Sequence, residues 1–296
     1  MRVFVTGASG FIGSAVVREL HGAGHDVIGL ARSDDAAAVL EAAGVGVHRG
    51  SIDDPQVLHE GAAAADGVIH LAFDNSFTDY AAATVADLRA VEALGAALEG
   101  SDKPFVVTSG TLALAFTPGL GTEDDPLDPA LPRVASEHAT TALAQRGVRS
   151  SVVRLAPCVH DETRAGLASS LIEIARRTGR SAFVDDGANR WPGVHRLDAA
   201  RLFRLALEAA PAGSRLHAVG EEGVPLRDIA DVIGRHLDVP VVGITAEESL
   251  DHFGFFALTV PLDNPTSSAL TQRLLGWEPS HAGLISDLDA PDHYRT

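Results

Sequence analysis

The first half of the chain alternates between short apolar runs and segments whose apolar residues recur at helical spacing. Six of the runs are apolar almost throughout, which predicts strands. They read RVFVTG, HDVIGLAR, VGVHRGSI, DGVIHLAF, KPFVVTSG and RSSVVRLAPCV. Helical segments such as FIGSAVVRELHGAG lie between them. This alternation predicts an α/β fold with a doubly wound parallel sheet, because such a sheet is covered by helices on both faces.

The pattern loosens after about residue 157. Three further helices are predicted in ETRAGLASSLIEIARRTG, DAARLFRLALEAAP and LRDIADVIGRHLD. We therefore predict a sheet domain over residues 1–157, to which later segments return, and a small C-terminal α/β substrate lobe over residues 158–296. A ligand cleft is expected between the lobe and the carboxyl ends of the strands. Residues 177–193 should line it, with Phe183 and Trp191 either as apolar ligand contacts or as core residues.

Composition and charge narrow the class of partner. The net charge of −17 argues against binding to a nucleic-acid backbone, and no apolar run approaches the ~20 residues that span a membrane. The start of the chain does not read as a signal peptide, and the one cysteine, Cys158, permits no intrachain disulfide, which fits a cytoplasmic protein. Ligand-type residues at 160–163 and 185–187 lack metal spacing, so no metal is predicted. A small molecule is the expected partner, and a homodimer stays open.

A glycine-rich turn, TGASGFIG, follows the first predicted strand and opens the first helix. Its three glycines are spaced to permit a tight turn, close approach of the backbone to a pyrophosphate, and close packing of the helix on the strand. The N–H groups at the start of the helix suit phosphate binding. The turn is therefore predicted to contact a dinucleotide. The contact residues are Gly7, Ser9, Gly10, Phe11, Ile12 and Gly13.

The end of the second predicted strand distinguishes NADP from NAD. NAD-binding sheets usually place Asp or Glu here to bind the ribose 2′-hydroxyl, but this chain has Ala31. Arg32 and Ser33 follow, and both can pair with a 2′-phosphate, which a carboxylate would repel. We predict NADP(H) as the cofactor, bound in part by Arg32 and Ser33.

These motifs, taken in order, resemble the short-chain dehydrogenase/reductase superfamily in its extended and atypical branches. The resemblance runs along essentially the whole chain, through VVTSG and RLAPCV to GVHRLDAARLF and LLGWEP. It implies a Rossmann fold and further cofactor contacts along the adenine, its ribose and the nicotinamide. The implied contact residues are Ser51, Ile52, Leu71, Ala72, Phe73, Ser109, Pro157, Cys158 and Val159.

The resemblance also implies a catalytic Tyr-x-x-x-Lys pair on the helix after the fifth strand. The tyrosines here are Tyr80 and Tyr294, and the one lysine is Lys103, so the chain holds no such pair. In the stretch RVASE, Arg133 and Glu137 fill the two places. Either they form an i, i+4 surface salt bridge, or they line the cleft, where Glu137 would accept from ribose hydroxyls and Arg133 would stabilise charge.

The proton donor must therefore be sought elsewhere. Ser109 and Thr111 flank the end of the fifth strand, where a hydroxyl either polarises a substrate carbonyl or only satisfies backbone groups. His160 follows the nicotinamide-side strand and is the first candidate for an acid that titrates near neutral pH, with a structural role as the alternative.

The combined interpretation is an NADP-dependent oxidoreductase with a non-standard proton donor. It would transfer hydride between the nicotinamide and a small carbonyl, imine or alkene substrate. A first alternative is a non-catalytic NADP(H)-binding sensor or regulator, which the missing Tyr and Lys favour. A second is a sugar-nucleotide epimerase or dehydratase, which Ala31 with Arg32 and the missing Tyr argue against.

Overall fold

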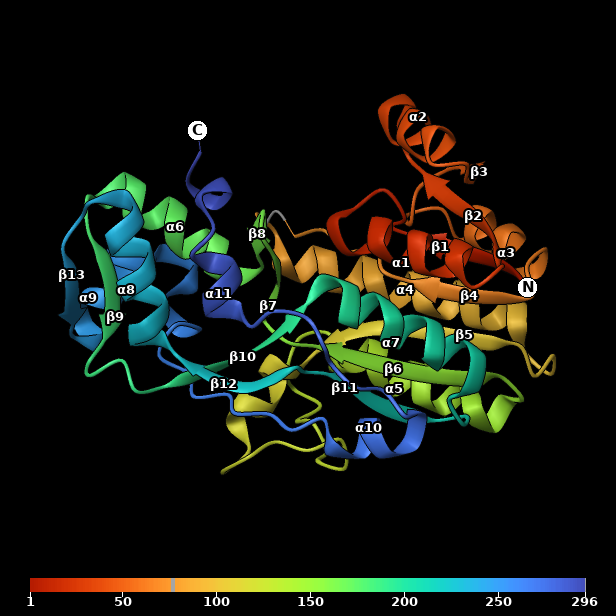
Figure 1. Cartoon of the computed structure of the whole chain (residues 1–296). Helices are drawn as coiled ribbons and strands as arrows, with labels where there is room; N and C mark the ends of the chain where they lie inside the picture. The colour runs from red at the N-terminus through yellow and green to blue at the C-terminus, as the bar shows by residue number, and fades with distance from the viewer. Residues whose placement is uncertain (76–77, 296) are drawn as a thin grey trace.

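The computed structural model describes residues 1–75 and 78–295, and these form a sheet domain with a smaller lobe beside it (Figure 1). The sheet has seven parallel strands in the order β11-β6-β5-β4-β1-β2-β3. The strands are β1 (Arg2–Thr6), β2 (Asp26–Ala31), β3 (Gly46–Arg49), β4 (Gly67–His70), β5 (Pro104–Gly110), β6 (Arg149–Leu155) and β11 (Ser214–Ala218). The doubly wound parallel sheet is confirmed, with β1 at the point where the strand order reverses.

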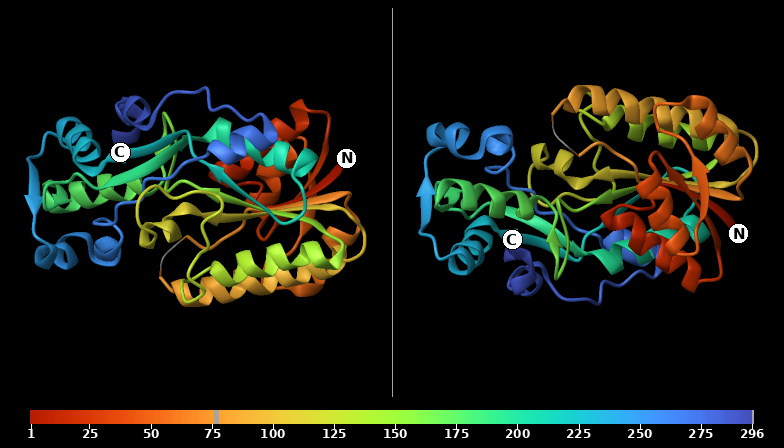
Figure 2. Two further views of the ribbon diagram at one scale, coloured as in Figure 1. Left: turned by 90° about the horizontal axis from the view of Figure 1, so that it is seen from below. Right: turned by 90° about the horizontal axis from the view of Figure 1, so that it is seen from above.

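Helices cover both faces of the sheet (Figure 2). Helices α1 and α7 pack together on one face, and α3, α4 and α5 form a layer on the other. The helices of this domain are α1 (Phe11–Gly22), α2 (Asp34–Ala42), α3 (Pro55–Ala63), α4 (Tyr80–Leu98), α5 (Val134–Ala142) and α7 (Arg196–Ala209), with 3-10 turns η1 (Thr111–Phe116) and η2 (Leu143–Arg146). Within the described ranges, none of the helices is both long and apolar enough to cross a membrane.

The apolar strands are explained by burial on both faces. Val3 and Val5 of β1 belong to the core under α1 and α7, whereas Phe4 between them belongs to the core under α3 and α4. Side chains alternate across a strand, so a sheet covered on both sides needs apolar residues at every position. Strand β11 was not predicted, because SRLHA is short and carries two basic residues.

Within the described residues, the lobe consists of two small sheets and four helices. A four-stranded sheet has the order β12-β10-β7-β8, and a two-stranded sheet pairs β13 with β9. Its strands are β7 (Cys158–Asp161), β8 (Arg164–Ala165), β9 (Ser181–Val184), β10 (Arg190–His195), β12 (Glu221–Pro225) and β13 (Val241–Ile244). Its helices are α6 (Leu167–Thr178), α8 (Leu226–Leu237), α9 (Ala246–Phe253) and α11 (Leu284–Leu288), with η3 (Gly254–Leu258) and η4 (Pro291–Tyr294). A later helix, α10 (Ala269–Leu275), returns to the sheet domain and packs against β11 and α7 (Figure 1).

The two aromatic residues weighed as ligand contacts in the lobe are core residues. Trp191 on β10 and Phe183 on β9 are both buried in the apolar cluster between the small sheets, α6 and α8. Cys158 on β7 is fully buried in the same cluster, and burial raises the pKa of its thiol to about 12. The Cys158 side chain therefore packs in the core of the lobe, and its contact with the nicotinamide stays a prediction.

A buried ionic cluster joins β6, α5 and β11. Arg154 of β6 is fully buried, and its Nη2 lies 2.5 Å from a carboxylate oxygen of Glu137 on α5. Its Nη1 lies 3.2 Å from Nε2 of His217 on β11, and Nδ1 of His217 lies 2.8 Å from the carbonyl oxygen of Ser267. A neutral imidazole protonated on Nδ1 satisfies both neighbours. Burial lowers the pKa of His217 to about 4.

We expect the free energy of unfolding to fall as the pH drops below about 6.5, the ordinary pKa of histidine. The unfolded chain then binds a proton at position 217, while the folded chain keeps His217 neutral until about pH 4. The loss reaches about 3 kcal/mol by that pH, at about 1.4 kcal/mol per pH unit. Urea unfolding at neutral pH and at about pH 5 measures it. The His217→Gln variant should lose less stability between the two conditions, and an equal loss would contradict the assignment.

Candidate active site

The turn between β1 and α1 is built for close backbone contact with an anion. Gly7 has φ +70°, and a Cβ there would lie 2.8 Å from the backbone N of Ala72. A Cβ on Gly13 would lie 2.0 Å from the carbonyl oxygen of Gly7, so α1 packs directly on the turn. Among the described residues, no side chain caps the start of α1, whereas Ser33, Asp54 and Asp79 cap the next three helices. The first N–H groups of α1 thus suit the pyrophosphate of a dinucleotide.

The segment after β4 runs beside this turn. The hydroxyl oxygen of Thr6 accepts hydrogen bonds from the N–H groups of Leu71 and Ala72, each at 3.2 Å. This brings Leu71, Ala72 and Phe73 to the carboxyl edge of the sheet next to Gly7, where the resemblance placed them.

A cleft of ≈ 500 Å³ lies where the adenine is expected, between the segment after β3 and the first turns of α4. Ile52 lines it, while the Ser51 hydroxyl donates to Asp53 at 3.0 Å. The lining residues are Ile52, Asp53, Asp79, Ala81, Ala82, Val85, Ala86 and Arg89.

Two arginines gather at the carboxyl ends of β2 and β3. Arg32 is exposed directly after β2, and Arg49 at the end of β3 lies in register with Ala31. The Arg49 guanidinium donates to the Ser33 carbonyl at 2.6 Å and forms an ion pair with Asp34. Ser33 itself caps α2 by accepting from the Ala36 N–H at 3.2 Å. The sequence analysis missed Arg49, although strand register alone would bring it beside Ala31.

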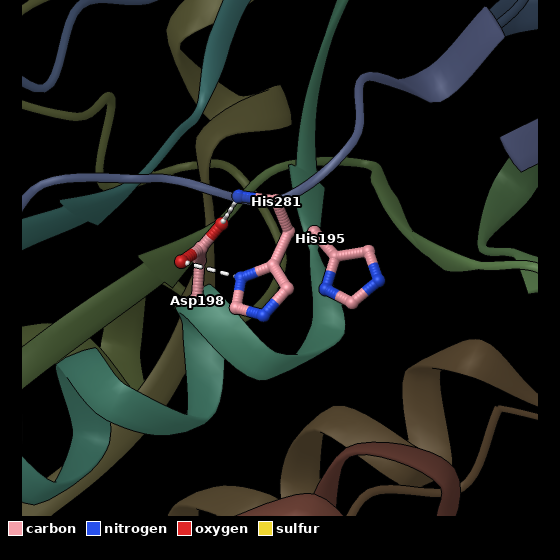
Figure 3. A group of neighbouring side chains, drawn as sticks. All are labelled: His195, Asp198 and His281. Carbon is pink, nitrogen blue, oxygen red and sulfur yellow. Dashed lines mark hydrogen bonds and ion pairs between the residues drawn. The ribbon is translucent and has the colours of Figure 1, made fainter. Parts of the chain in front are cut away.

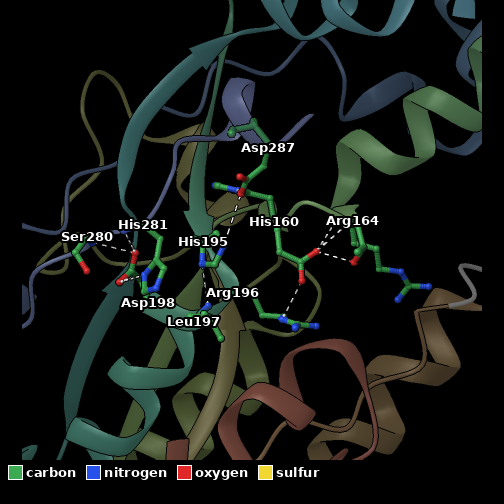
Figure 4. A network of polar contacts seen from close by, with 12 residues as sticks. His160, Arg164, His195, Arg196, Leu197, Asp198, Ser280, His281 and Asp287 are labelled. Atoms are coloured by element: carbon green, nitrogen blue, oxygen red, sulfur yellow. Dashed lines mark hydrogen bonds and ion pairs between the residues drawn. The ribbon is translucent and has the colours of Figure 1, made fainter. Parts of the chain in front are cut away.

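Two more arginines lie over Phe11 at the start of α1. The guanidinium of Arg196 is 4.6 Å from the ring centroid, and that of Arg164 is 5.7 Å from it. Figure 4 shows Arg164 on β8 of the lobe and Arg196 at the start of α7, and Arg196 pairs with Asp161 at 3.1 Å. They add positive charge beside the predicted pyrophosphate site. Sequence reasoning missed them because β8 and α7 reach α1 only through the tertiary fold.

Arg133 lies at the carboxyl end of β5. It stands directly before α5 in a left-handed conformation, with φ +65°. Its guanidinium donates to the Thr108 carbonyl at 3.0 Å and covers the ring of Phe73 at 3.9 Å. It also lies 3.6 Å from Asp87 on α4. The left-handed backbone turns Arg133 toward Phe73 and the strand end, so its predicted place at the cleft stays a prediction that the geometry supports.

The side chain of Glu137 points into the interior of the protein, away from the side chain of Arg133. It is 3% exposed and accepts from Arg154 under α5. Neither reading of RVASE describes it, because Glu137 forms a buried ion pair with Arg154 rather than a surface pair with Arg133. This pairing speaks against a contact of Glu137 with a ribose, which stays a prediction. Local sequence could not reveal this, since Arg154 is a strand residue seventeen positions further on.

Two of the three proposed proton donors are enclosed by protein. Thr111 is fully buried, and it exchanges hydrogen bonds with Asn264 at 3.3 Å and 3.0 Å. His160 is 1% exposed, with Nδ1 2.7 Å from Asp287. Both have structural partners, which favours the structural alternative for each, and their catalytic roles stay predictions. Ser109 is half-buried at the carboxyl end of β5 and remains a candidate. Beyond β6, Pro157 is half-buried and Val159 is buried in the core.

His160 belongs to a network of histidines and carboxylates between the lobe and α7 (Figure 4). The ring of His195 lies edge-on to His160 at 5.7 Å and stacks on His281 at 4.5 Å. His281 contacts Asp198 of α7 at 2.9 Å. Burial lowers the pKa of His195. For Asp198 burial acts the other way, but hydrogen bonds from His281 and nearby backbone N–H groups lower the pKa overall.

His195, Asp198 and His281 place ligand-type atoms within 4.8 Å of one another (Figure 3). The two imidazoles are nearly parallel, with 8° between their planes. Imidazole lone pairs lie in the ring plane, so parallel stacked rings do not direct them at one ion. The His195 Nδ1 also accepts from the Leu197 N–H at 3.2 Å. The group therefore serves as a hydrogen-bonded contact between β10, α7 and the segment before α11.

The chain matches a known family over most of the sheet domain and beyond. Residues 3–219 match the model of the NAD dependent epimerase/dehydratase family. The chain belongs to this family. Its extended short-chain dehydrogenase/reductase fold agrees with the resemblance drawn from the motifs.

Relatives of the chain include reductases. An uncharacterized protein of Schizosaccharomyces pombe is 48% identical over 295 residues, 99% of this chain and 100% of that protein. The 2-alkyl-3-oxoalkanoate reductase of Stenotrophomonas maltophilia is 29% identical over 260 residues, 82% of this chain and 77% of the reductase. The dTDP-glucose 4,6-dehydratase structure from Streptomyces venezuelae with NAD bound has TM-score 0.76 at 21% identity, covering 99% and 97% of the two chains. The chain is thus a reductase-like member of an NAD(P)-dependent family.

Asp87 is a charged residue near the carboxyl ends of β4 and β5 that was not predicted from the sequence. It is 1% exposed and lies 3.4 Å from His70 at the end of β4. Burial disfavours its charged form, but His70, Arg133 and Ser136 together lower the pKa of Asp87. The sequence carried a signal for this residue, because Asp87 interrupts an apolar helix face that continues with Val91.

We expect Glu137→Gln to destabilise the protein and to leave cofactor affinity unchanged. The substitution leaves the buried Arg154 without its carboxylate, at a cost of about 3 kcal/mol or more. Glu99→Gln is the matched control, because Glu99 pairs with Arg146 at the surface, where such a pair contributes less than about 1 kcal/mol. Urea unfolding and NADPH titration measure both effects. An unchanged unfolding midpoint with weakened NADPH binding would place Glu137 at the ribose instead.

Proposed function

We propose that this protein is an NADP(H)-dependent oxidoreductase that reduces a carbonyl, imine or alkene group of a small organic molecule. The observation that carries the proposal is the uncapped start of α1 on its glycine turn, next to arginines rather than an acid at the end of β2. The similarity to a reductase of Stenotrophomonas maltophilia supports the direction of the reaction.

The arginines at the ends of β2 and β3 support NADP(H) rather than NAD(H). Arg32 is exposed, and Arg49 approaches the backbone of Ser33 from the neighbouring strand. Guanidinium groups bind a 2′-phosphate through charge-assisted hydrogen bonds. Asp34 opposes this in part, because it pairs with Arg49.

The residues at the carboxyl ends of β4 and β5 would orient the substrate. When bound, the reduced nicotinamide supplies the hydride. The Ser109 hydroxyl would donate a hydrogen bond to the substrate oxygen and polarise the bond that is reduced. Arg133, held by Thr108 and Phe73, would place positive charge near the oxygen on which negative charge develops.

Two other functions share the same nucleotide site. A sugar-nucleotide epimerase or dehydratase is favoured by the family's description and by the likeness to a dTDP-glucose dehydratase fold. Such an enzyme would retain its nucleotide and show no net oxidation of added NADPH. A sensor would bind NADPH and turn over nothing.

The direct test mixes pure protein with NADPH and a panel of carbonyl, imine, quinone and activated alkene compounds. We expect saturable quenching of protein fluorescence by NADPH and loss of NADPH absorbance with at least one class. Binding without oxidation would favour the sensor, and conversion of a nucleotide sugar without added cofactor would favour the epimerase or dehydratase. If the protein neither binds nor oxidises NADPH, the proposal is excluded.

The cofactor preference is tested with Arg32→Ala and Arg49→Ala. Each should weaken NADPH binding by about tenfold, the effect of losing about 1.4 kcal/mol of phosphate contact, with little change for NADH. Arg146→Ala is the control, since Arg146 pairs with Glu99 near the amino ends of β5 and β6, at the edge of the sheet opposite the carboxyl ends. Equal losses for NADPH and NADH would show that neither arginine contacts a 2′-phosphate.

A further inference from the structure

Tyr80 lies among the groups that gather at the catalytic end of the sheet. It is the first residue of α4, and its ring meets the ring of Phe73 edge-on at 5.9 Å. Phe73 is the residue that the Arg133 guanidinium covers at 3.9 Å. One aromatic ring therefore separates the Tyr80 phenol from a fixed cation, beside the end of β5 that carries Ser109.

Tyr80 also shares a helix face with Asp87. The two residues are seven positions apart on α4, which is about two turns of helix, so they lie along the same side of it. Asp87 lies 3.6 Å from Arg133 and 3.4 Å from His70. The charged groups that act on the phenol are Arg133 from the start of α5 and Asp87 from its own helix.

The lobe closes over the other side of Tyr80. The ring of Phe255 on η3 lies 6.3 Å from the Tyr80 ring, and Phe256 is next to it at 5.3 Å. Tyr80 is half-buried at this contact between the sheet domain and the lobe. This is the position in which a substrate bound against the carboxyl ends of the strands would meet it.

The other candidate proton donors at this end are either enclosed by protein or weaker acids than a phenol. Thr111, His160 and Cys158 are enclosed by protein and have structural contacts. The Ser109 hydroxyl can orient a carbonyl, but an aliphatic alcohol is a weaker acid than a phenol, whose ordinary pKa is about 10.

We propose that Tyr80 is the proton donor of the reduction and that Arg133 stabilises the phenolate formed, an inference that rests on the proposed function. Hydride passes from the reduced nicotinamide to the carbonyl carbon, and the electron pair of the C=O bond moves to the oxygen. That oxygen takes the Tyr80 proton, giving the alcohol and the oxidised cofactor. The phenolate regains a proton from water. The pair takes over the roles of the missing Tyr and Lys from different segments of the chain.

The protonation state of Tyr80 agrees with this role. Burial raises the pKa of Tyr80, Arg133 lowers it and Asp87 raises it again. The phenol is therefore protonated at neutral pH and ready to donate. Arg133 acts in the direction that eases the loss of the proton.

The first test is a titration that needs no substrate. The chain has two tyrosines, and burial raises the pKa of Tyr294 well above its usual range. Tyrosinate absorbance should therefore rise in two steps, of which the lower disappears in Tyr80→Phe. Arg133→Gln should move this lower step to higher pH, while Arg133→Lys, which keeps the charge, should restore it. If the pH of the lower step does not depend on the charge at position 133, the pairing of Tyr80 with Arg133 is overturned.

The second test is kinetic. Tyr80→Phe should lower kcat for a carbonyl substrate about 100-fold, the scale of general acid catalysis, with NADPH affinity within about twofold of the wild type. Tyr294→Phe is the matched control and should keep full activity. In the wild type kcat should fall at high pH, and Arg133→Gln should shift that limb upward in parallel with the titration. Full kcat in Tyr80→Phe would overturn the donor role alone, whereas a wild type that oxidises no NADPH would overturn the oxidoreductase itself.

Discussion

Arg154 is a fully buried cation, and its need for hydrogen-bond partners constrains how several elements of this protein pack. A guanidinium in the interior carries five N–H groups that must be met by acceptors on several sides. Glu137 meets it from α5, His217 from β11, and the carbonyl oxygen of Asp125 from the loop before α5 at 3.5 Å. One cation thereby holds a helix, the edge strand and a connecting loop in place against β6.

The same ion pair determines how the start of α5 is used. Glu137 is drawn under the helix, so the carboxylate that stands in the place of the family's lysine serves the core. Arg133, four residues earlier, leaves the helix in a left-handed conformation and reaches Phe73 and Asp87. Within RVASE, Glu137 therefore packs in the core, whereas Arg133 lies at the carboxyl end of β5. The family's pattern places its two functional residues on one helix face. Here the charged side chains come from separate elements, with Asp87 on α4, Arg133 directly before α5 and Arg154 on β6.

Much of the fold, including the position of the glycine-rich turn, followed from local pattern. Apolar runs at strand length, helical periodicity and the glycines of TGASGFIG are properties of neighbouring residues, and the structure places those elements where they were predicted. The weaker predictions concerned strand ends. Thr111 and His160 have the right chemistry at reasonable positions, but Asn264 and Asp287 cover them from segments more than a hundred residues away.

The sequence by itself determined the doubly wound sheet, the glycine-rich turn before the first helix and the lack of a Tyr-x-x-x-Lys pair, because each depends on residue identity at short spacing. Only the tertiary structure decided which polar side chains face the cleft and which face the core. Burial and pairing of charge depend on contacts between separate elements, such as Arg154 with Glu137 and His160 with Asp287. Those contacts arise when distant segments pack together, and no local pattern encodes them.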